Sequence, residues 1–360
     1  MADSDTYYQW LRQKGVSRRD FLKFCTMITA MLGLDITALP NVVEALETKP
    51  RLPVIYLNLQ ECTCCGESFL RSGHPLVADL ILSMISLDYM ETLQAAAGER
   101  AEAARLKTIR DNPGNYVVVV EGSPTVAQGG IYCTIGGRTS VDILKETAAN
   151  AAAVIAYGSC ATNGCVQGAY PNPTQAVPVR RVITDKPVID VPGCPPIAEV
   201  ITGTIVHFLT FGKIPELTAQ GRPAAFYSHR VHDGCNRRAF FDAGQFVESF
   251  DDAGAKQGWC LYNMGCKGPT TYNACAITQW NGGLSYPIKS GHPCLGCSEN
   301  NWYDNTPFYT HLAEIPNDAI GVNPDKIGLS ALAVAGVGVV AHAAATAATK
   351  ARERVDKKDR

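Results

Sequence analysis

Four short apolar runs constrain the fold of this 360-residue chain more than any other feature. All four are rich in β-forming residues, and they cover residues 54–59, 117–122, 153–158 and 188–192. Longer segments with helical periodicity separate or follow them, namely residues 76–95, 139–151 and 196–211. Strands that alternate with helices of this length predict a parallel sheet whose two faces are covered. We therefore expect an α/β fold that binds its ligands beyond the carboxyl ends of the strands.

Six of the fourteen cysteines follow three of these predicted strands, and they are Cys62, Cys64, Cys65, Cys160, Cys165 and Cys194. The carboxyl ends of parallel strands meet at one edge of a sheet, so the three loops should converge. The loop after the second predicted strand adds Glu121 and Gly122 to the same edge. Clustered cysteines at one edge indicate metal ligation or redox chemistry rather than packing. Two or three disulfides are the alternative if the protein is exported.

A second group of candidate ligands lies in a region rich in Gly, Pro, Asn and Tyr. Its members are His232, Cys235, Cys260, Cys266, Cys275, Cys294 and Cys297. His-x-x-Cys and Cys-x-x-Cys are typical ligand spacings, and metal binding can order a region that forms little regular structure. Zinc is one candidate, because His/Cys₃ sets hold structural zinc. Iron–sulfur clusters fit the total number of cysteines better.

Residues 1–45 have the pattern of an export signal, and we expect them to lie outside the fold. Arg18 and Arg19 precede a modestly apolar run, residues 24–34, and Ala45 lies in a region suited to processing. This pattern is typical of twin-arginine signals, which direct export of folded proteins that already contain a cofactor. The alternative is an ordinary amphipathic helix.

Residues 327–349 contain no charged side chain and are bracketed by Lys326 and Lys350. Twenty-three residues in a helix span about 34 Å, enough to cross a hydrocarbon core of about 30 Å. By the positive-inside rule the basic tail, residues 350–360, predicts a cytoplasmic C-terminus and a body on the outer face of the membrane. A buried Ala-rich helix is the alternative. His342, inside the run, either packs or lies near a partner's redox centre.

The motifs taken together resemble those of the small, electron-transferring subunit of membrane-bound nickel–iron uptake hydrogenases. The matching segments, in order, are ECTCCGESF, GSCATNGC, PGCPP, HDGCNRR, CLYNMGCKGPTTYNAC and PCLGC. The resemblance implies a flavodoxin-like parallel-sheet domain over residues 46–220, an irregular iron–sulfur cluster domain over 221–326 and a C-terminal transmembrane helix. The cluster-binding subunit of a respiratory complex shares the adjacent pair Cys64 and Cys65 but lacks HDGC and PCLGC.

The resemblance also implies three iron–sulfur clusters in a row. The proximal cluster would use Cys62, Cys65, Cys160 and Cys194, and oxygen-tolerant relatives add the equivalents of Cys64 and Cys165 to form a 4Fe–3S cluster. Without the two extra ligands it would be 4Fe–4S. The distal 4Fe–4S cluster would use His232, Cys235, Cys260 and Cys266, and the medial 3Fe–4S cluster Cys275, Cys294 and Cys297. Pro287 stands where some relatives have a fourth medial ligand.

Two cysteines remain outside these sets, Cys25 in the signal segment and Cys133. We expect Cys133 to be a buried small hydrophobe. Of the acidic residues, Glu121 matches a glutamate that approaches an iron of the oxidised proximal cluster in oxygen-tolerant relatives. Glu61 is either solvated or assists proton movement near the interface between subunits.

The resemblance finally implies that this chain does not split hydrogen alone. In the family the nickel–iron site belongs to a separate large subunit, and no motif cysteine is left here to form one. Electrons would pass from that partner through this chain to a membrane cytochrome b and quinone, in a dimer of heterodimers. A formal net charge of −2 gives no electrostatic footprint for nucleic acid. A zinc-bound or disulfide-bound surface module without enzymatic activity is the alternative function.

Overall fold

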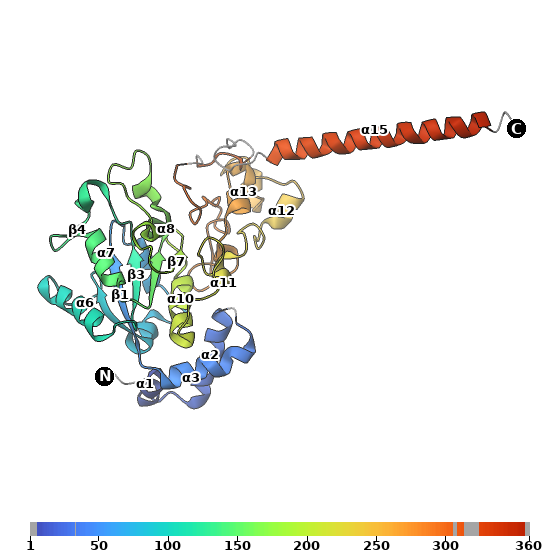
Figure 1. Ribbon diagram of the computed structural model, residues 1–360. Helices are drawn as coiled ribbons and strands as arrows, with labels where there is room; N and C mark the ends of the chain where they lie inside the picture. The colour runs from blue at the N-terminus through green and yellow to red at the C-terminus, as the bar shows by residue number, and fades with distance from the viewer. Residues whose placement is uncertain (1–5, 33, 305–307, 313–323, 357–360) are drawn as a thin grey trace. The chain divides into compact units, whose positions relative to one another are not determined.

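A five-stranded parallel sheet organises the body of the protein (Figure 1). Its strands are β1 (Leu52–Asn58), β2 (Ile85–Met90), β3 (Val117–Glu121), β6 (Ala153–Tyr157) and β7 (Val188–Val191). They lie in the order β2-β1-β3-β6-β7, which is the strand order of flavodoxin-like folds. The four predicted strands are confirmed within two residues at each end, and β2 is an additional edge strand.

The computed structural model describes residues 6–32, 34–304, 308–312 and 324–356. Residues 1–309 and 310–360 form two separate compact units. The sheet and the cysteine-rich region that follows it both belong to the first unit.

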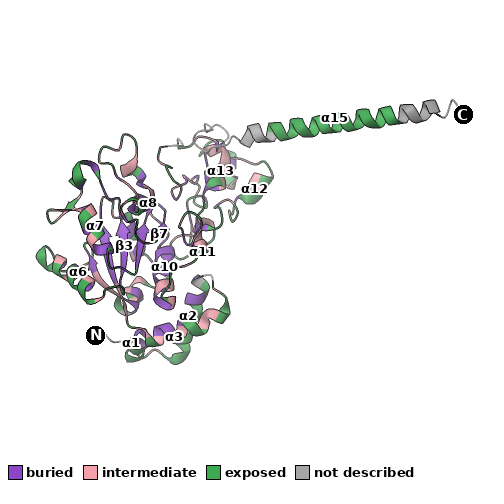
Figure 2. Ribbon diagram, in the orientation of Figure 1, coloured by how far each residue is buried: buried purple, intermediate pink, exposed green. Residues whose placement is uncertain are grey.

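The two faces of the sheet are buried against different helices (Figure 2). Side chains alternate along a strand, so Ile55 and Val118 face one hydrophobic cluster while Tyr56 and Val119 face the other. On the first face pack α6 (Glu99–Asp111) and α7 (Ser140–Ala148). On the second face packs α10 (Ala198–Phe211), which ends at Gly212 in a left-handed conformation. The predicted helices over 139–151 and 196–211 are therefore confirmed.

The predicted helix over residues 76–95 is wrong for most of its length. Only α5 (Val77–Asp79) and a π-helical segment, Leu80–Met84, precede β2. The run after Ile85 pairs with β1 in parallel, with a register shift between Val54 and Ile55. Backbone hydrogen bonds to a neighbouring strand override the local pattern here. Helix α6, between β2 and β3, was not among the predicted elements.

The N-terminal segment packs on the body, contrary to the expectation that it lies outside the fold. It contains α1 (Tyr7–Gln13), α2 (Arg18–Met31), the 3₁₀ turn η1 (Ile36–Ala38) and α3 (Leu39–Thr48). On α2, Phe21, Cys25 and Ile28 are fully buried in the same cluster as Ile201 and Ile205 of α10. Their spacing forms one apolar stripe, and burial of that stripe stabilises the contact.

The region after α10 has little regular structure. It contains the short helices α11 (Ala224–Tyr227), α12 (Arg238–Asp242) and α13 (Ala253–Gln257), and the 3₁₀ turns η5 (Tyr262–Met264), η6 (Gly268–Thr270) and η7 (Ala274–Ala276). A small separate core, which includes Val231, Leu261 and Ile288, supports it. Both features agree with the predicted irregular region.

The second unit contains the long helix α15, Pro324–Asp356. Its segment Leu329–Thr349 has 21 residues and a mean hydropathy of 1.8, long and apolar enough to cross a membrane. The side chains of this segment are exposed (Figure 2). The predicted C-terminal apolar helix is confirmed by length and composition.

Candidate metal centres

Three strand-to-helix turns bring the first cysteine group to the carboxyl edge of the sheet. Helix α4 (Cys64–Leu70) follows β1, and α8 (Ser159–Asn163) with η4 (Cys165–Gly168) follows β6, while Cys194 comes just after β7. The sulfur atoms of Cys165 and Cys194 lie 3.9 Å apart. The loops therefore converge as the strand pattern predicted. That separation is about twice a disulfide bond, and all fourteen cysteines are free.

Gly158 makes room for this convergence. Its φ of +92° lies in the left-handed region, and an added Cβ would sit 2.3 Å from the sulfur of Cys65. No side chain fits at position 158 while the Cys65 thiol keeps its place. The glycine thus allows the β6–α8 turn to approach the start of α4.

The remaining thiols of this group lie close enough to influence one another's protonation. Burial raises the pKa of Cys65, and it is raised further by Glu121 and by three neighbouring thiols, those of Cys194, Cys62 and Cys64. The pKa of Cys165 is raised to about 12, mainly by a hydrogen bond with Cys160. A bound cation is needed to hold such thiols as thiolates. All six predicted proximal residues are thus brought together, with Cys62, Cys64 and Cys194 exposed at the surface.

Glu121 anchors the start of α4 from the end of β3. Its carboxylate accepts hydrogen bonds from the backbone amides of Cys65, at 2.9 Å, and Gly66, at 3.0 Å. It also accepts from the Tyr56 hydroxyl at 2.8 Å and the Asn58 amide at 3.2 Å. Burial raises the pKa of Glu121, and these hydrogen bonds oppose that rise. The carboxylate therefore holds a backbone segment that carries two of the thiols.

Glu61 is half-buried next to the first thiol of the group. One carboxylate oxygen accepts a hydrogen bond from the Thr63 hydroxyl at 3.3 Å, and the other is buried with no partner among the described residues. Burial, followed by the nearby Glu121, raises the pKa of Glu61 to about 7. A carboxyl group with this pKa can exchange a proton near neutral pH.

The second group divides into two sets. One cavity is lined by all four predicted distal residues, which are His232, Cys235, Cys260 and Cys266. Burial lowers the pKa of His232, so its imidazole is neutral at physiological pH, the form that binds metals. The ring packs edge-on against Phe241, with centroids 4.6 Å apart.

The other set consists of Cys275, Cys294 and Cys297, the predicted medial residues. All three residues are half-buried, and burial raises the pKa of each thiol, for Cys275 and Cys297 to about 12. The negative charge of Cys294 raises the pKa of Cys275 further, and that of Cys275 raises the pKa of Cys297. The set is compact although it spans 23 positions of sequence.

Neighbouring sets meet at two points, which gives them a linear order. The hydroxyl of Ser159, next to Cys160 of the first set, donates a hydrogen bond to the carbonyl of Cys297 in the medial set. The backbone amide of Cys294, in the medial set, donates to the sulfur of Cys266 in the distal set at 3.4 Å. The medial thiols therefore lie between the other two groups.

The donor set fits iron–sulfur clusters. Free thiols and one neutral imidazole are the ligands that such clusters take. Within the described part of the chain, no three His, Cys, Asp or Glu side chains converge tightly enough for a single metal ion. Ligands of a cluster bind different iron atoms, so they need not converge on one point.

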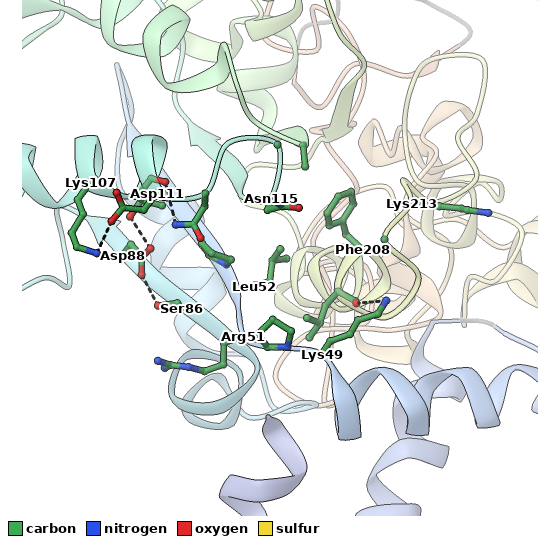
Figure 3. Close-up of a pocket in the computed structure, with 18 of the residues that line it drawn as sticks. Lys49, Arg51, Leu52, Ser86, Asp88, Lys107, Asp111, Asn115, Phe208 and Lys213 are labelled. Carbon is green, nitrogen blue, oxygen red and sulfur yellow. Dashed lines mark hydrogen bonds and ion pairs between the residues drawn. The ribbon is translucent and has the colours of Figure 1, made fainter. Parts of the chain in front are cut away.

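A cavity of about 1120 Å³ lies at the opposite, amino edge of the sheet (Figure 3). It is lined by the first residues of the strands, among them Leu52 and Ser86, and contains no cysteine. Two of its charged groups pair locally: Lys107 with Asp111 at 2.9 Å, and Lys49 with the carbonyl of Thr210 at 2.6 Å. In parallel α/β sheets ligands bind at the carboxyl edge, so we assign no redox role to this cavity.

Two cysteines lie apart from the three sets, as expected. Cys25 is fully buried in α2. Cys133 is half-buried against the hydrophobic cluster under α7, so it is less buried than predicted. Sequence patterns do not single out Lys267, although a cation directly after the candidate ligand Cys266, in the motif GCKGP, is a visible signal. The structure shows that Lys267 is buried.

Comparisons with known proteins agree with this division of the chain. The family described as NADH ubiquinone oxidoreductase, 20 Kd subunit, matches residues 62–208, and the family described as the C-terminal part of the NiFe/NiFeSe hydrogenase small subunit matches residues 227–309. The first match covers the cysteine edge and four of the five strands of the sheet, and the second covers the irregular region.

Individual relatives match almost the entire chain. The uptake hydrogenase small subunit of Azotobacter vinelandii is 54% identical over 357 residues, covering 99% of this chain and 100% of the relative. That of Cupriavidus necator is 56% identical over 350 residues, covering 97% of each. A crystal structure of the reduced, active Ni-Fe-Se hydrogenase from Desulfomicrobium baculatum superimposes with a TM-score of 0.68 at 32% identity, covering 72% of this chain and 99% of that one.

Proposed function

The chain belongs to the family of nickel–iron uptake hydrogenase small subunits, the electron-transferring component of that enzyme, and we propose that it relays electrons through three iron–sulfur clusters to a membrane cytochrome b and quinone. Membership implies iron–sulfur clusters and a large subunit that holds the nickel–iron site. The number and type of clusters, the acceptor and the topology are our proposals.

One observation carries the relay: hydrogen bonds join each of the three groups of free thiols to the next. They run from Ser159 to Cys297 and from Cys294 to Cys266. When bound, the clusters supply sites that accept and release single electrons. Electrons would enter where Cys62, Cys64 and Cys194 are exposed, because these thiols are accessible to a partner chain.

The proximal residues support a cluster of the oxygen-tolerant type. Cys64 and Cys165, the two extra cysteines, belong to the same thiol group as the other four proximal residues, which are Cys62, Cys65, Cys160 and Cys194. We propose that all six hold a 4Fe–3S cluster. Glu121 keeps the backbone of Cys65 and Gly66 in place and is itself within reach of the group. Glu61 would hold or pass a proton at the same edge, since its pKa is about 7.

The other two sets differ in ligand chemistry. We propose that Cys275, Cys294 and Cys297 hold a medial 3Fe–4S cluster, because the group offers three thiols and Pro287 lacks a donor. His232, Cys235, Cys260 and Cys266 would hold a distal 4Fe–4S cluster. Replacing one thiolate with the neutral imidazole of His232 reduces the negative charge of that site, which favours a position near the acceptor.

The apolar helix supports membrane anchoring. Leu329–Thr349 would cross the bacterial inner membrane, with the body in the periplasm and the basic tail in the cytoplasm. Arg18 and Arg19 would direct export through the twin-arginine route, and a dimer of heterodimers would be the complete assembly. The formal net charge of −2 gives no electrostatic footprint for nucleic acid.

Purification of the intact membrane complex tests the proposal. Iron and acid-labile sulfide should co-purify with this chain, nickel with a second, larger chain, and haem with a membrane subunit. Resolved paramagnetic signals from three clusters are expected. A preparation that contains zinc without labile sulfide would contradict the proposal and support the surface-module alternative.

A further inference from the structure

Lys267 lies where the distal and medial thiol groups meet. It directly follows the distal residue Cys266, and its backbone amide donates a hydrogen bond to the carbonyl of Cys294 at 2.7 Å. The amide of Cys294 donates in return to the sulfur of Cys266 at 3.4 Å. These two hydrogen bonds fix Lys267 at the junction between the two groups.

The side chain of Lys267 is held inside the protein at this junction. The residue is only 4% exposed. Its stem packs on the backbone of Gly296, where an added Cβ would lie 3.4 Å from the Lys267 Cβ. The Lys267 carbonyl accepts hydrogen bonds from the hydroxyls of Thr271, at 2.7 Å, and Thr270, at 3.1 Å. The position of the lysine is therefore set by contacts on several sides.

A lysine in this position is expensive to bury unless negative charge lies nearby. Lys267 is bonded to Cys266 of the distal group and hydrogen-bonded to Cys294 of the medial group, so negative charge on a cluster at either residue lies close to this buried lysine. The two thiolates that would bind different clusters therefore share one cation. Charges interact more strongly here than in water, because the effective dielectric constant is lower.

We propose that Lys267 is an electrostatic positioning residue that raises the reduction potentials of both the medial and the distal cluster. The inference rests on the proposed function, since it requires clusters at these thiols. Each cluster gains one negative charge when it is reduced, and a fixed cation between them stabilises both reduced states. Raising the two potentials together leaves the step between them unchanged and favours electron transfer from the proximal cluster to the medial one. Lys267 adjoins one distal and one medial residue, so we expect its effect to fall on these two clusters and not on the proximal one.

Redox titration of the purified complex tests this inference, with the paramagnetic signal of each cluster followed separately. Lys267→Met removes the charge and keeps the length of the stem. We expect it to shift the reduction equilibrium of both the medial and the distal cluster toward the oxidised state by about tenfold, or about 59 mV for one electron. The proximal potential should not change. Lys267→Arg keeps the charge and should leave all three potentials as in the wild type. Lys256→Met, at an exposed position of α13, is the matched control.

Unchanged medial and distal potentials in Lys267→Met would overturn the inference, as would an equal shift of all three clusters. A shift in Lys267→Arg as large as that in Lys267→Met would overturn it as well, because packing rather than charge would then be responsible. If Lys267→Met loses iron and sulfide, the iron and sulfide contents of a second neutral variant, Lys267→Gln, are measured as well. Loss in both neutral variants but not in Lys267→Arg supports the role of the charge, and loss in all three overturns it. Iron and sulfide in the wild type test the proposed function separately.

Discussion

The sulfur atoms of Cys165 and Cys194 lie 3.9 Å apart, although the two residues follow different strands, β6 and β7. Cys165 is one of the two extra cysteines that we propose for the oxygen-tolerant pattern, and Cys194 is one of the other four proposed proximal ligands. Their proximity means that the extra thiol lies inside the proximal group and not beside it. The arrangement gives the oxygen-tolerance hypothesis a structural basis.

Replacing Cys64 and Cys165 with Gly should therefore separate hydrogen oxidation from oxygen tolerance. Four thiols remain to hold the proximal cluster, so the double variant should oxidise hydrogen under anaerobic conditions at close to the wild-type rate. In air its activity should be lost. Cys133→Ala, which lies outside the three groups, is the control. Activity in air that equals the wild type would contradict the hypothesis.

Export should depend on the two arginines at the start of α2. Arg18 forms an ion pair with Glu47 and lies over the ring of Tyr8, while Arg19 is exposed. Replacement of both by Lys keeps the charge but should trap the chain and its partner in the cytoplasm, because the signal requires arginine. Arg12→Lys, in α1, is the matched control. Cell fractionation measures the distribution.

Protease added to intact spheroplasts checks the proposed topology independently. It should digest the body of the wild-type chain and spare an epitope fused to the basic tail after residue 350. A body that resists digestion in spheroplasts but not in lysed cells would contradict a periplasmic location.

The distal group should depend on His232. Replacement by Ala leaves an open iron position or removes the cluster, so quinone-linked hydrogen oxidation should fall at least about tenfold. Hydrogen–deuterium exchange needs only the partner's nickel–iron site and should survive. His229→Ala, at an exposed position three residues earlier, is the control. Full turnover with an unchanged distal spectrum would refute the assignment, and loss of exchange as well would indicate that the chain has unfolded.

Gly158 should be essential for the proximal group. An alanine there would meet the sulfur of Cys65, so Gly158→Ala should prevent loading of the proximal cluster. Gly114→Ala provides the control, because Gly114 has a φ of +76° but no atom within 4 Å of the added Cβ. It should cost about 1–2 kcal/mol of stability and leave the iron content unchanged. Equal iron content in both variants would show that the contact at Cys65 does not prevent the proximal cluster from binding.

The stability of the body should decrease as pH rises from acidic to neutral, because of Asp190. Burial raises the pKa of this carboxyl from 3.8 to about 7, against the lowering effect of Arg180. Between about pH 4 and pH 7 the folded state keeps a proton that the unfolded state has released, so the free energy of unfolding decreases as pH rises and levels off above pH 7. A shift of this size corresponds to at most about 4 kcal/mol.

Asp190→Asn should therefore flatten the dependence of the melting temperature on pH between 5 and 8, measured on the purified complex. Asp185→Asn is the matched control, since Asp185 is exposed and its carboxylate lies 3.9 Å from Lys186. An equally steep dependence in the Asp190 variant would exclude this residue as the cause.

Much of the fold could be predicted because its signals are local. The runs that became β3 and β6 are apolar and β-branched, and a strand buried on both faces requires this composition. The helical pattern over 76–95 failed for the opposite reason. Ile85–Met90 becomes a strand by pairing with β1, a partner about 30 positions away in sequence. The N-terminal segment was misplaced because its apolar stripe, which resembles a signal, also fits the face of α10.

The sequence by itself determined which atoms are available for redox chemistry: the cysteines, His232 and their spacing along strand ends and loops. Only the tertiary structure decided how the groups touch. The contact of Cys294 with Cys266, the fit of Gly158 against Cys65 and the burial of Lys267 between two groups each join residues that are distant in sequence or hidden by packing. Spacing along the chain specifies ligands because a motif lies within one loop. Contacts between loops depend on how the whole chain packs. Packing therefore decides which residues outside a motif lie close to a given cluster.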